Sequence, residues 1–498
     1  MDIQMSPNKL VQFLGKPPDE FTKRDIIRFI EANEIRMVNF RYVGGDGRLK
    51  QLNFVINNRA HLDTLLSAGE RVDGSSLFSY IDAASSDLYV IPRFKTAYVN
   101  PFSPIPALDI LCSYYTHEGV PLPSSPENVL RKAHQALKEN TGLSLEALGE
   151  LEYYVFSDKQ EVYPSDPQKG YHESSPFSKW ELLRREAMET IAQSGGVIKY
   201  GHTEVGFVSG QYQDMEQHEI EFAPVPLEDA ADQIVIGKYI LRMTGYKYKV
   251  PISFAPKIVV GHAGSGLHIH SKLIKGKENM LVQDGHLSDI ARRNIAGYLR
   301  LAKSLTAFGN TVPLSYLRLV PHQEAPTNIC WGDRNRSALV RVPLGWLGVN
   351  SMVRDANPQE TEEFEQAYDN QTVEFRSPDG SANIYFLLAG LAVAARHGLE
   401  MPDAIEYSNN LYADVNIFED EHSDVRSRLP QLPASCWESA DHLLEDREIY
   451  EADGVFSPVL IDGVVRMLRG YNDLDLSEKL YGRDQEIEDL IKEYLYCS

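Results

Sequence analysis

The sequence predicts an α+β protein with a small N-terminal domain and a larger second domain. Helix and strand signals alternate over the first part of the chain, and a polar segment follows them. Several strands beyond that segment carry charged side chains two residues apart, with apolar residues between them. The 498 residues, of which 43% are hydrophobic, suffice to bury a large core, so we expect two folded domains.

The first domain is expected to begin with a helix from about Lys23 to Asn33. Two strand-like segments follow, IRMVNFRYV and LKQLNFVI, and the GGDG turn between them predicts a hairpin. After the strand ALDILCSYY comes the polar stretch THEGVPLPSSPE, in which Ser125 can cap a helix that opens with Pro126. We place the boundary in this stretch, with one domain over residues 1–116 and the other over 117–498.

The second domain is expected to alternate short strands with helices. The helices are predicted over Asn128 to Glu139, Lys179 to Gln193, Leu287 to Phe308 and Asn383 to His397, and the C-terminal segment, rich in Glu, Lys and Leu, is also expected to be helical. The apolar run YFLLAGLAVAARHG is too short to span a membrane and ends in Arg and His. It predicts a buried helix.

Composition excludes several classes of function. The 71 acidic and 49 basic residues give a net charge of −22, which phosphodiester backbones and anionic membranes would repel. We therefore expect no nucleic acid and no membrane as partner. The four cysteines are widely spaced and MDIQMSPNKL has no apolar signal segment, which predicts a cytoplasmic protein. The sequence has no Walker phosphate loop and no complete dinucleotide fingerprint, so ATP would bind without them.

The paired charged residues in the strands are the candidates for metal binding and catalysis. In GELEYYVF, Glu150 and Glu152 project to one face because strand side chains alternate. The same spacing relates Glu219 to Glu221, His268 to His270 and Glu374 to Arg376. A sheet with one solvated face is the ordinary explanation for any single strand. Carboxylates crowded on one face repel each other unless a cation lies between them, and oxygen ligands with one or two imidazoles suit Mg²⁺ or Mn²⁺.

An arginine-rich segment, SYLRLVPHQEAPTNICWGDRNRSALVRVP, adds positive charge to this picture. It carries Arg318, Arg334, Arg336 and Arg341. Divalent metals with several arginines are the means by which proteins stabilise a phosphoryl group in transfer. A surface ion pair remains the alternative for any one arginine.

Seven segments together resemble the glutamine synthetase family of the bacterial and archaeal type. In chain order they are VDGSS, GELEYYVF, GHTEVG with QHEIEF, GSGLHIH, RLVPHQEAP, RNRSALVRVP and VEFRSPDGSANIY. The resemblance covers nearly the whole chain. It implies a β-grasp-like N-terminal domain and a catalytic domain with a curved antiparallel sheet flanked by helices. It also implies an ATP-dependent carbon-nitrogen ligase that amidates glutamate with ammonia through γ-glutamyl phosphate.

The resemblance implies two catalytic sites for Mg²⁺ or Mn²⁺. The matching ligands are Glu152, Glu204 and Glu219 for one ion and Glu150, His268 and Glu374 for the other. The segment between Glu204 and Glu219 is longer than is usual in the family, so Glu216 is a rival for the last ligand of the first set. We favour Glu219 because HEIEF preserves the strand alternation.

Further residues take family roles by the same resemblance. Arg318 matches the residue that binds the α-carboxylate of glutamate, with Gly264 in the glutamate-binding loop; Arg336, Arg341 and Arg376 match the phosphate-binding arginines; His270 lies near the nucleotide; and Glu324 matches the flap residue that closes the site. Asp73, Ser76 and Tyr171 match the ammonium site, where the family takes the aspartate from a neighbouring subunit. The resemblance therefore implies a homo-oligomer, usually two stacked hexameric rings.

Three departures leave the nitrogen donor open. Ala263 replaces an asparagine of the glutamate-binding loop, and His322 and Gln323 replace a Gly-Tyr pair before the flap residue. These changes keep open a γ-glutamyl amide synthetase that uses a polyamine or another primary amine. A non-catalytic structural relative is a further alternative, although every ligand type is retained. Tyr412 occupies roughly the position of the tyrosine that some bacterial members have adenylylated, but the proline-rich segment that normally follows is absent.

Overall fold

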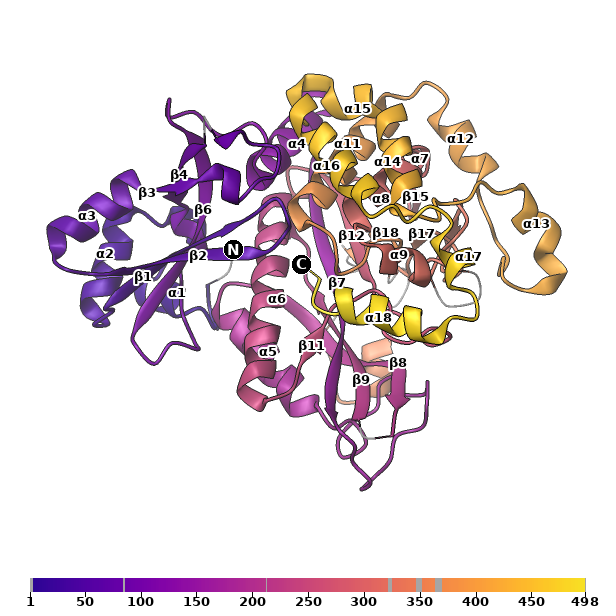
Figure 1. Cartoon of the computed structure of the whole chain (residues 1–498), viewed down its shortest axis with the longest axis horizontal. Helices are drawn as coiled ribbons and strands as arrows, with labels where there is room; N and C mark the ends of the chain where they lie inside the picture. The colour runs from indigo at the N-terminus through magenta and orange to yellow at the C-terminus, as the bar shows by residue number, and fades with distance from the viewer. Residues whose placement is uncertain are drawn as a thin grey trace.

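The computed structural model describes residues 3–83, 86–211, 213–320, 325–345, 352–362 and 370–497. It shows an N-terminal domain, indigo in Figure 1, beside a larger domain coloured from magenta to yellow. Each part has its own hydrophobic core. The predicted α+β class, with a small domain followed by a large one, is confirmed.

The N-terminal domain is a mixed sheet covered by short helices. Its main elements are α1 (Lys9–Leu14), α2 (Lys23–Ala32), β1 (Met37–Val43), β2 (Leu49–Val55), α3 (Arg59–Ala68), β3 (Glu70–Asp73), β4 (Asp87–Pro92), β5 (Tyr98–Val99) and β6 (Ala107–Thr116). The strand order is β2-β1-β6-β4-β3, and β1 runs parallel to β6 and antiparallel to β2. Thr22 and Asp25 form a capping box at the start of α2, where the sequence predicts a helix.

The second domain is built on a long, largely antiparallel sheet. Its path is β16-β17-β18-β12-β7-β9-β8, with β10, β11 and β13 beside it. These strands are β7 (Ser144–Asp158), β8 (Ile198–Ser209), β9 (Gln213–Phe222), β10 (Val225–Pro226), β11 (Ile252–Ser253), β12 (Leu267–Lys275), β13 (Glu278–Asn279), β16 (Trp331–Asp333), β17 (Val340–Val342) and β18 (Val373–Phe375). A separate hairpin joins β14 (Val282–Gln283) to β15 (His286–Leu287).

Helices cover the sheet and form the C-terminal part. They are α4 (Pro126–Thr141), α5 (Glu181–Gln193), α6 (Leu227–Tyr248), α7 (Asp289–Arg300), α8 (Ala302–Gly309), α9 (Pro313–Arg318), α10 (Met352–Ala356), α11 (Ile384–Glu400), α12 (Ala404–Asn410), α13 (Ser423–Arg428), α14 (Cys436–Glu445), α15 (Arg447–Glu451), α16 (Pro458–Gly470), α17 (Leu476–Leu480) and α18 (Asp484–Tyr494). The prediction of one helix from Leu287 to Phe308 is wrong. It is two helices, because Leu301 leaves the helical conformation with φ −99° and ψ 9°.

The apolar run in α11 forms the centre of the helical layer. All residues from Ile384 to Arg396 are buried, and α11 packs against α4, α7 and α8. The prediction of a buried helix is confirmed. Among the described residues, the length and apolarity that a membrane crossing requires are not found in any one helix. The pair α11 and α12, bent by 110°, meets the criterion only by length and composition.

Buried polar contacts fix the N-terminal domain against α6. Arg93 binds the two carboxylate oxygens of Asp232 at 2.7 and 2.9 Å, and Tyr385 Oη donates to the same carboxylate at 2.6 Å. Arg41 Nη2 donates to Tyr239 Oη at 2.9 Å. Bidentate arginine pairs fix orientation as well as distance. The angle between the two domains is therefore defined by side chains from both.

We expect Gly297→Ala to lower the free energy of unfolding by about 1–3 kcal/mol. A Cβ at Gly297 would lie 1.9 Å from Ala394 O, a backbone atom of α11, so α7 and α11 would have to separate. Chemical denaturation would measure the loss. The control is Gly470→Ala at the end of α16, where a Cβ meets nothing within 4 Å. Equal losses for the two variants would contradict this account of the helix contact.

Candidate active site

A cavity of about 1350 Å³ opens on one face of the central sheet. Its walls come from β7, β8, β9, β12, β17 and β18, together with Arg318 at the end of α9. Pairing between strands sets the charged side chains opposite each other. The register places Glu150 opposite both Glu221 and His268, Glu152 opposite Glu219, and Glu374 opposite both His270 and Arg341. Alternation thus brings the charged pairs of several strands to one face.

The first cluster of ligating atoms joins three strands. Glu150, His268 and Glu374 each offer an atom within 4.8 Å of the others. His268 Nδ1 lies 2.9 Å from Glu150 Oε2 and 3.6 Å from Glu374 Oε1. These are the residues assigned to one metal by the family resemblance. Two carboxylates and an imidazole within this distance could hold a divalent cation.

The second cluster contains Glu204, Glu219 and His202, also within 4.8 Å of one another. His202 was not identified from the sequence, although its position two residues before Glu204 repeats the spacing of the other pairs. Glu152, the third residue expected here, accepts hydrogen bonds from Gln217 Nε2 and Gly266 N at 3.0 and 2.8 Å. It lines the same cavity, and its Oε1 lies 3.8 Å from His268 Nε2, between the two clusters.

Glu216, the rival of Glu219, has different neighbours. Its carboxylate accepts hydrogen bonds from Ser178 Oγ at 2.8 Å and from Lys179 N at 2.9 Å, and it lies 2.9 Å from His218 Nε2. Glu216 does not line the cavity, whereas Glu219 does. Positions three apart in a strand face opposite sides, so the geometry favours Glu219 as the ligand.

The carboxylates of the site lack enough nearby positive charge among the described residues to balance them. Burial raises the pKa of Glu219 well above its usual value, and repulsion from Glu150, Glu152 and Glu204 raises it further. The pKa of Glu150 is lowered instead, since the imidazoles of His270 and His268 outweigh the cost of burial. Lys199 Nζ lies 2.6 Å from Glu221 and supplies one local positive charge. A bound cation between the carboxylates would relieve the remaining repulsion.

Arginines line the cavity beside the first cluster. Arg376 Nε and Arg341 Nη1 each donate to Glu374 at 3.0 Å, so both are held beside the first cluster. Arg336 lines the same cavity as Tyr171, and Arg376 reaches the carbonyl of Arg336. These three guanidinium groups are positioned to surround an anion next to the ligating carboxylates.

Arg318 lies at the bottom of the cavity, where only 3% of its surface is exposed. Its Nη1 donates to Ser377 O at 2.7 Å. Gly264 and Gly266 pass close to it: a Cβ at Gly266 would lie 2.5 Å from Arg318 Nη2 and 2.9 Å from His268 Nε2. Glycine at this position therefore lets a guanidinium and an imidazole share one wall.

The residues expected at the ammonium site do not all line the cavity. Tyr171 lines the cavity and stacks on His172, with 4.2 Å between ring centroids. Asp73 and Ser76 do not line it within this chain. Asp73 is the last residue of β3 and Ser76 lies in the turn that follows, where Ser76 Oγ donates to Asp73 Oδ2 at 2.6 Å. Glu324, His322 and Gln323 lie outside the described residues.

This two-domain fold, with its charged sheet face, is that of an ATP-dependent ligase. Residues 34–117 match the family description "Glutamine synthetase, beta-Grasp domain", and residues 123–470 match "Glutamine synthetase, catalytic domain". The chain belongs to the glutamine synthetase family. The match over 34–117 confirms the β-grasp domain expected from the sequence.

Individual relatives agree with this membership. The chain is 30% identical over 483 residues to glutamine synthetase of Mycolicibacterium smegmatis, covering 89% of this chain and 94% of the relative. It is 28% identical over 448 residues to the Clostridium saccharobutylicum glutamine synthetase, covering 87% and 92%. Among solved structures, Plasmodium falciparum glutamine synthetase superposes with a TM-score of 0.73 at 19% identity, covering 92% of this chain and 97% of that one. The apo structure of GmaS superposes with a TM-score of 0.70 at 19% identity, covering 90% and 95%.

We expect Mg²⁺ or Mn²⁺ to stabilise the folded protein, by about 2.7 kcal/mol at about 100 times the dissociation constant. Glu219→Gln should raise the thermal midpoint of the metal-free protein near pH 7, because it removes a buried carboxyl group whose ionised form is disfavoured by burial and by its neighbours. It should also reduce the rise that metal produces. Thermal unfolding with metal and with chelator would measure both effects.

The matched control is Glu216→Gln on the same strand. It breaks hydrogen bonds outside the cavity, so the midpoint should fall while the rise produced by metal persists. The pH dependence gives a second check. Because the folded pKa of Glu219 lies above its usual 4.5, the folded state holds the extra proton above that pH, and stability falls as pH rises. Glu219→Gln should flatten this decline; an unchanged slope would count against the assignment.

Proposed function

We propose that the protein is a glutamine synthetase, which uses ATP to join glutamate and ammonia, giving glutamine, ADP and phosphate. One observation carries the proposal: ligating carboxylates and imidazoles from adjacent strands line one cavity together with several arginines. The relatives named above support the same reaction. The absence of a Walker loop fits, since this site would bind phosphates through metals and arginines. We further propose that the protein acts in the cytoplasm.

Two divalent cations would be held at the clusters described above. Glu152, Glu204 and Glu219 would hold one, with His202 beside them, and Glu150, His268 and Glu374 would hold the other. Bound Mg²⁺ or Mn²⁺ would supply charge neutralisation for the substrate carboxylate and the nucleotide phosphates. The residues fit this role because the carboxylates crowd together at distances that raise the pKa of Glu219.

The protein's own cations would act on the substrates. Arg318 would bind the α-carboxylate of glutamate. Gly264 packs against this arginine, since a Cβ there would lie 3.0 Å from Arg318 Cγ and 2.3 Å from Pro256 O. Arg336, Arg341 and Arg376 would neutralise the phosphoryl group as it moves from ATP to the γ-carboxylate. His270 would lie beside the nucleotide; its Nε2 lies 2.9 Å from Glu150 and its Nδ1 3.0 Å from Thr372, which hold the ring in place.

The ammonium site requires a second copy of the chain. Hydrogen bonds from Ser76 and Ser75 lower the pKa of Asp73, so its carboxylate is held ionised and can attract ammonium. Because Asp73 does not line its own cavity, it would serve the cavity of a neighbour in a ring, usually two stacked hexamers in this family. Glu324 would close the site and exclude water, which would otherwise hydrolyse the acyl phosphate.

A primary amine is the second candidate for the nitrogen donor. Four rings contact one another in series: Tyr171, His172, His202 and Tyr200, with 4.3 Å between the centroids of His172 and His202. His202 Nδ1 lies 3.7 Å from the Glu204 carboxylate. Aromatic faces next to a carboxylate bind alkylammonium groups by cation-π attraction. This observation favours a γ-glutamyl amide synthetase over the non-catalytic alternative.

Phosphate release by the purified protein with ATP, Mg²⁺ and glutamate tests the donor. We expect ammonium to stimulate release more than putrescine, ethanolamine or methylamine do. Preference for an amine would identify a γ-glutamyl amide synthetase, and Tyr200→Leu should then weaken amine use by about threefold to thirtyfold. No stimulation by ammonium or by any amine would exclude both reactions.

Asp73→Ala should reduce amide formation about 100-fold or more while some glutamate-dependent phosphate release remains. The reason is that Asp73 would serve the second half of the reaction only. Asp87→Ala is the matched control, because Asp87 is exposed and pairs with Asp73 in the sheet. Mixed oligomers of Asp73→Ala and Glu204→Ala chains should regain activity if neighbours share sites. Equal loss of phosphate release and amide formation in Asp73→Ala would argue against this role.

A further inference from the structure

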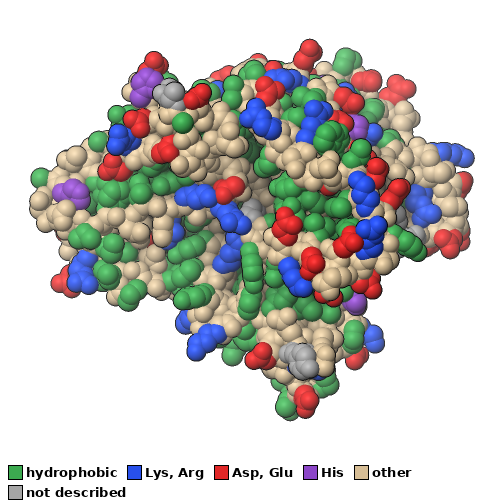
Figure 2. Space-filling model, in the orientation of Figure 1, with side chains coloured by type: hydrophobic (Ala, Val, Ile, Leu, Met, Phe, Trp, Pro, Cys, Tyr) green, Lys and Arg blue, Asp and Glu red, His purple; other side chains and the backbone are tan. Residues whose placement is uncertain are grey.

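A second cavity, of about 1000 Å³, lies where three parts of the chain meet. The turn between β1 and β2 contributes Gly47 and Arg48, α6 contributes one side, and the segment after α18 contributes Tyr496. The surface view shows basic and hydrophobic side chains together where the N-terminal domain meets the catalytic domain (Figure 2). None of its lining residues belongs to the active-site cavity. The reaction proposed above leaves it without a role.

The lining has an unusual charge for this protein. Five basic residues line the cavity, and its described lining contains no Asp or Glu: Arg48, Lys238, Arg242, Lys247 and Lys249. The whole chain carries a net charge of −22, so a cavity whose charged lining residues are all basic differs from the rest of the protein. Lys247 pairs with Glu186 at 2.7 Å, whereas Arg48 and Arg242 donate to backbone carbonyl oxygens.

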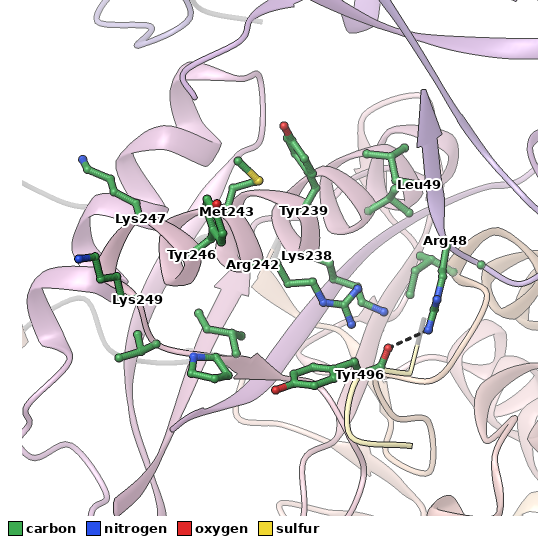
Figure 3. A pocket seen from close by; sticks show the side chains of 16 residues that line it. Arg48, Leu49, Lys238, Tyr239, Arg242, Met243, Tyr246, Lys247, Lys249 and Tyr496 are labelled. Atoms are coloured by element: carbon green, nitrogen blue, oxygen red, sulfur yellow. Dashed lines mark hydrogen bonds between the residues drawn. The ribbon is translucent and has the colours of Figure 1, made fainter. Parts of the chain in front are cut away.

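Three of the cations converge at the inner end of the cavity (Figure 3). Arg48 donates to Tyr496 O at 3.0 Å, Arg242 to Cys497 O at 2.8 Å, and Lys238 to Gly380 O at 2.7 Å. Carbonyl groups orient Arg48 and Arg242. Burial, together with repulsion from Arg242, lowers the pKa of Lys238 to about 7. An anion placed among them would be held by charge-assisted hydrogen bonds.

The rest of the wall is apolar. It is formed by Val235, Tyr239, Met243, Ile252 and Ile384. Tyr246 lies at its edge, with 80% of its surface exposed. The guanidinium of Arg242 also lies 5.0 Å from the centroid of the Phe254 ring, which keeps it in place. A mostly apolar pocket with a few convergent polar groups is the usual form of a small-molecule site.

We propose that this cavity binds a small organic anion. The acid group, a carboxylate, sulfonate or phosphate, lies against Arg48, Arg242 and Lys238. A flat or branched apolar body lies along the α6 side of the cavity. Because α6 also packs under the catalytic sheet, with Ile234 against Gly149 of β7, the ligand contacts a helix that supports the strand carrying Glu150.

The probes are naphthalene-1-sulfonate and naphthalene-1-sulfonamide, which share one shape and differ in charge. Calorimetric titration of the full-length protein, with saturating ADP and Mg²⁺ to occupy the active site, should show one sulfonate site per chain. The neutral sulfonamide should bind about tenfold more weakly or worse. Inorganic sulfate should compete with the sulfonate. Equal affinity for the two probes, or loss of sulfonate binding when ADP is present, would overturn the proposal.

Substitutions of the arginines that line the cavity test where the sulfonate binds. Arg242→Met and Arg48→Met should each weaken sulfonate binding about tenfold, and Arg242→Lys should weaken it less. The control is Arg428→Met on α13, a side chain that is 80% exposed, and it should bind like the unaltered protein. Thermal unfolding would check each variant, and Arg48→Met on the exposed turn serves if Arg242→Met fails to fold. Binding unchanged in both arginine-to-methionine variants would refute the assignment.

Discussion

The repulsion between buried carboxylates on one sheet face is the constraint on which the rest of this structure depends. Hydrogen bonding between strands fixes Glu150, Glu152 and Glu219 close together, and the fold cannot separate them without losing its register. The imidazoles of His268 and His270 offset part of the repulsion, and the guanidinium groups of Arg341 and Arg376 offset more at Glu374. A bound cation, as proposed above, would relieve what remains, and local instability and metal affinity would then have one source.

The sequence was sufficient to predict the charged face because alternation in a strand is a local rule. Glu150 and Glu152 share a face wherever that strand pairs, and the motifs supplied the order of the strands. The same rule, applied once more, would have found His202. It could not foresee that Leu301 interrupts a helix, because the turn depends on packing between α7, α8 and α11 rather than on a helix-breaking residue.

Features formed by distant segments were beyond sequence reasoning for a different reason. The rings of Tyr171, His172 and His202 come from a loop and a strand, and only the fold brings them together. The basic cavity combines the hairpin turn, α6 and the C-terminal tail, whose residues are separated by hundreds of positions. In the sequence, Arg48 and Arg242 are unremarkable surface arginines. Their meaning depends on tertiary contacts, which single-strand or single-helix patterns do not encode.

The clamp between Arg93 and Asp232 has a consequence for assembly. A subunit that reaches its neighbour through one domain and receives it on the other behaves as a wedge, and the wedge angle fixes how many copies complete a circle. Here a bidentate ion pair, reinforced by Tyr385, determines that angle inside each subunit. In the ring proposed above, loosening this pair would allow the subunits to miss closure, so the copies would form open chains instead of closed rings.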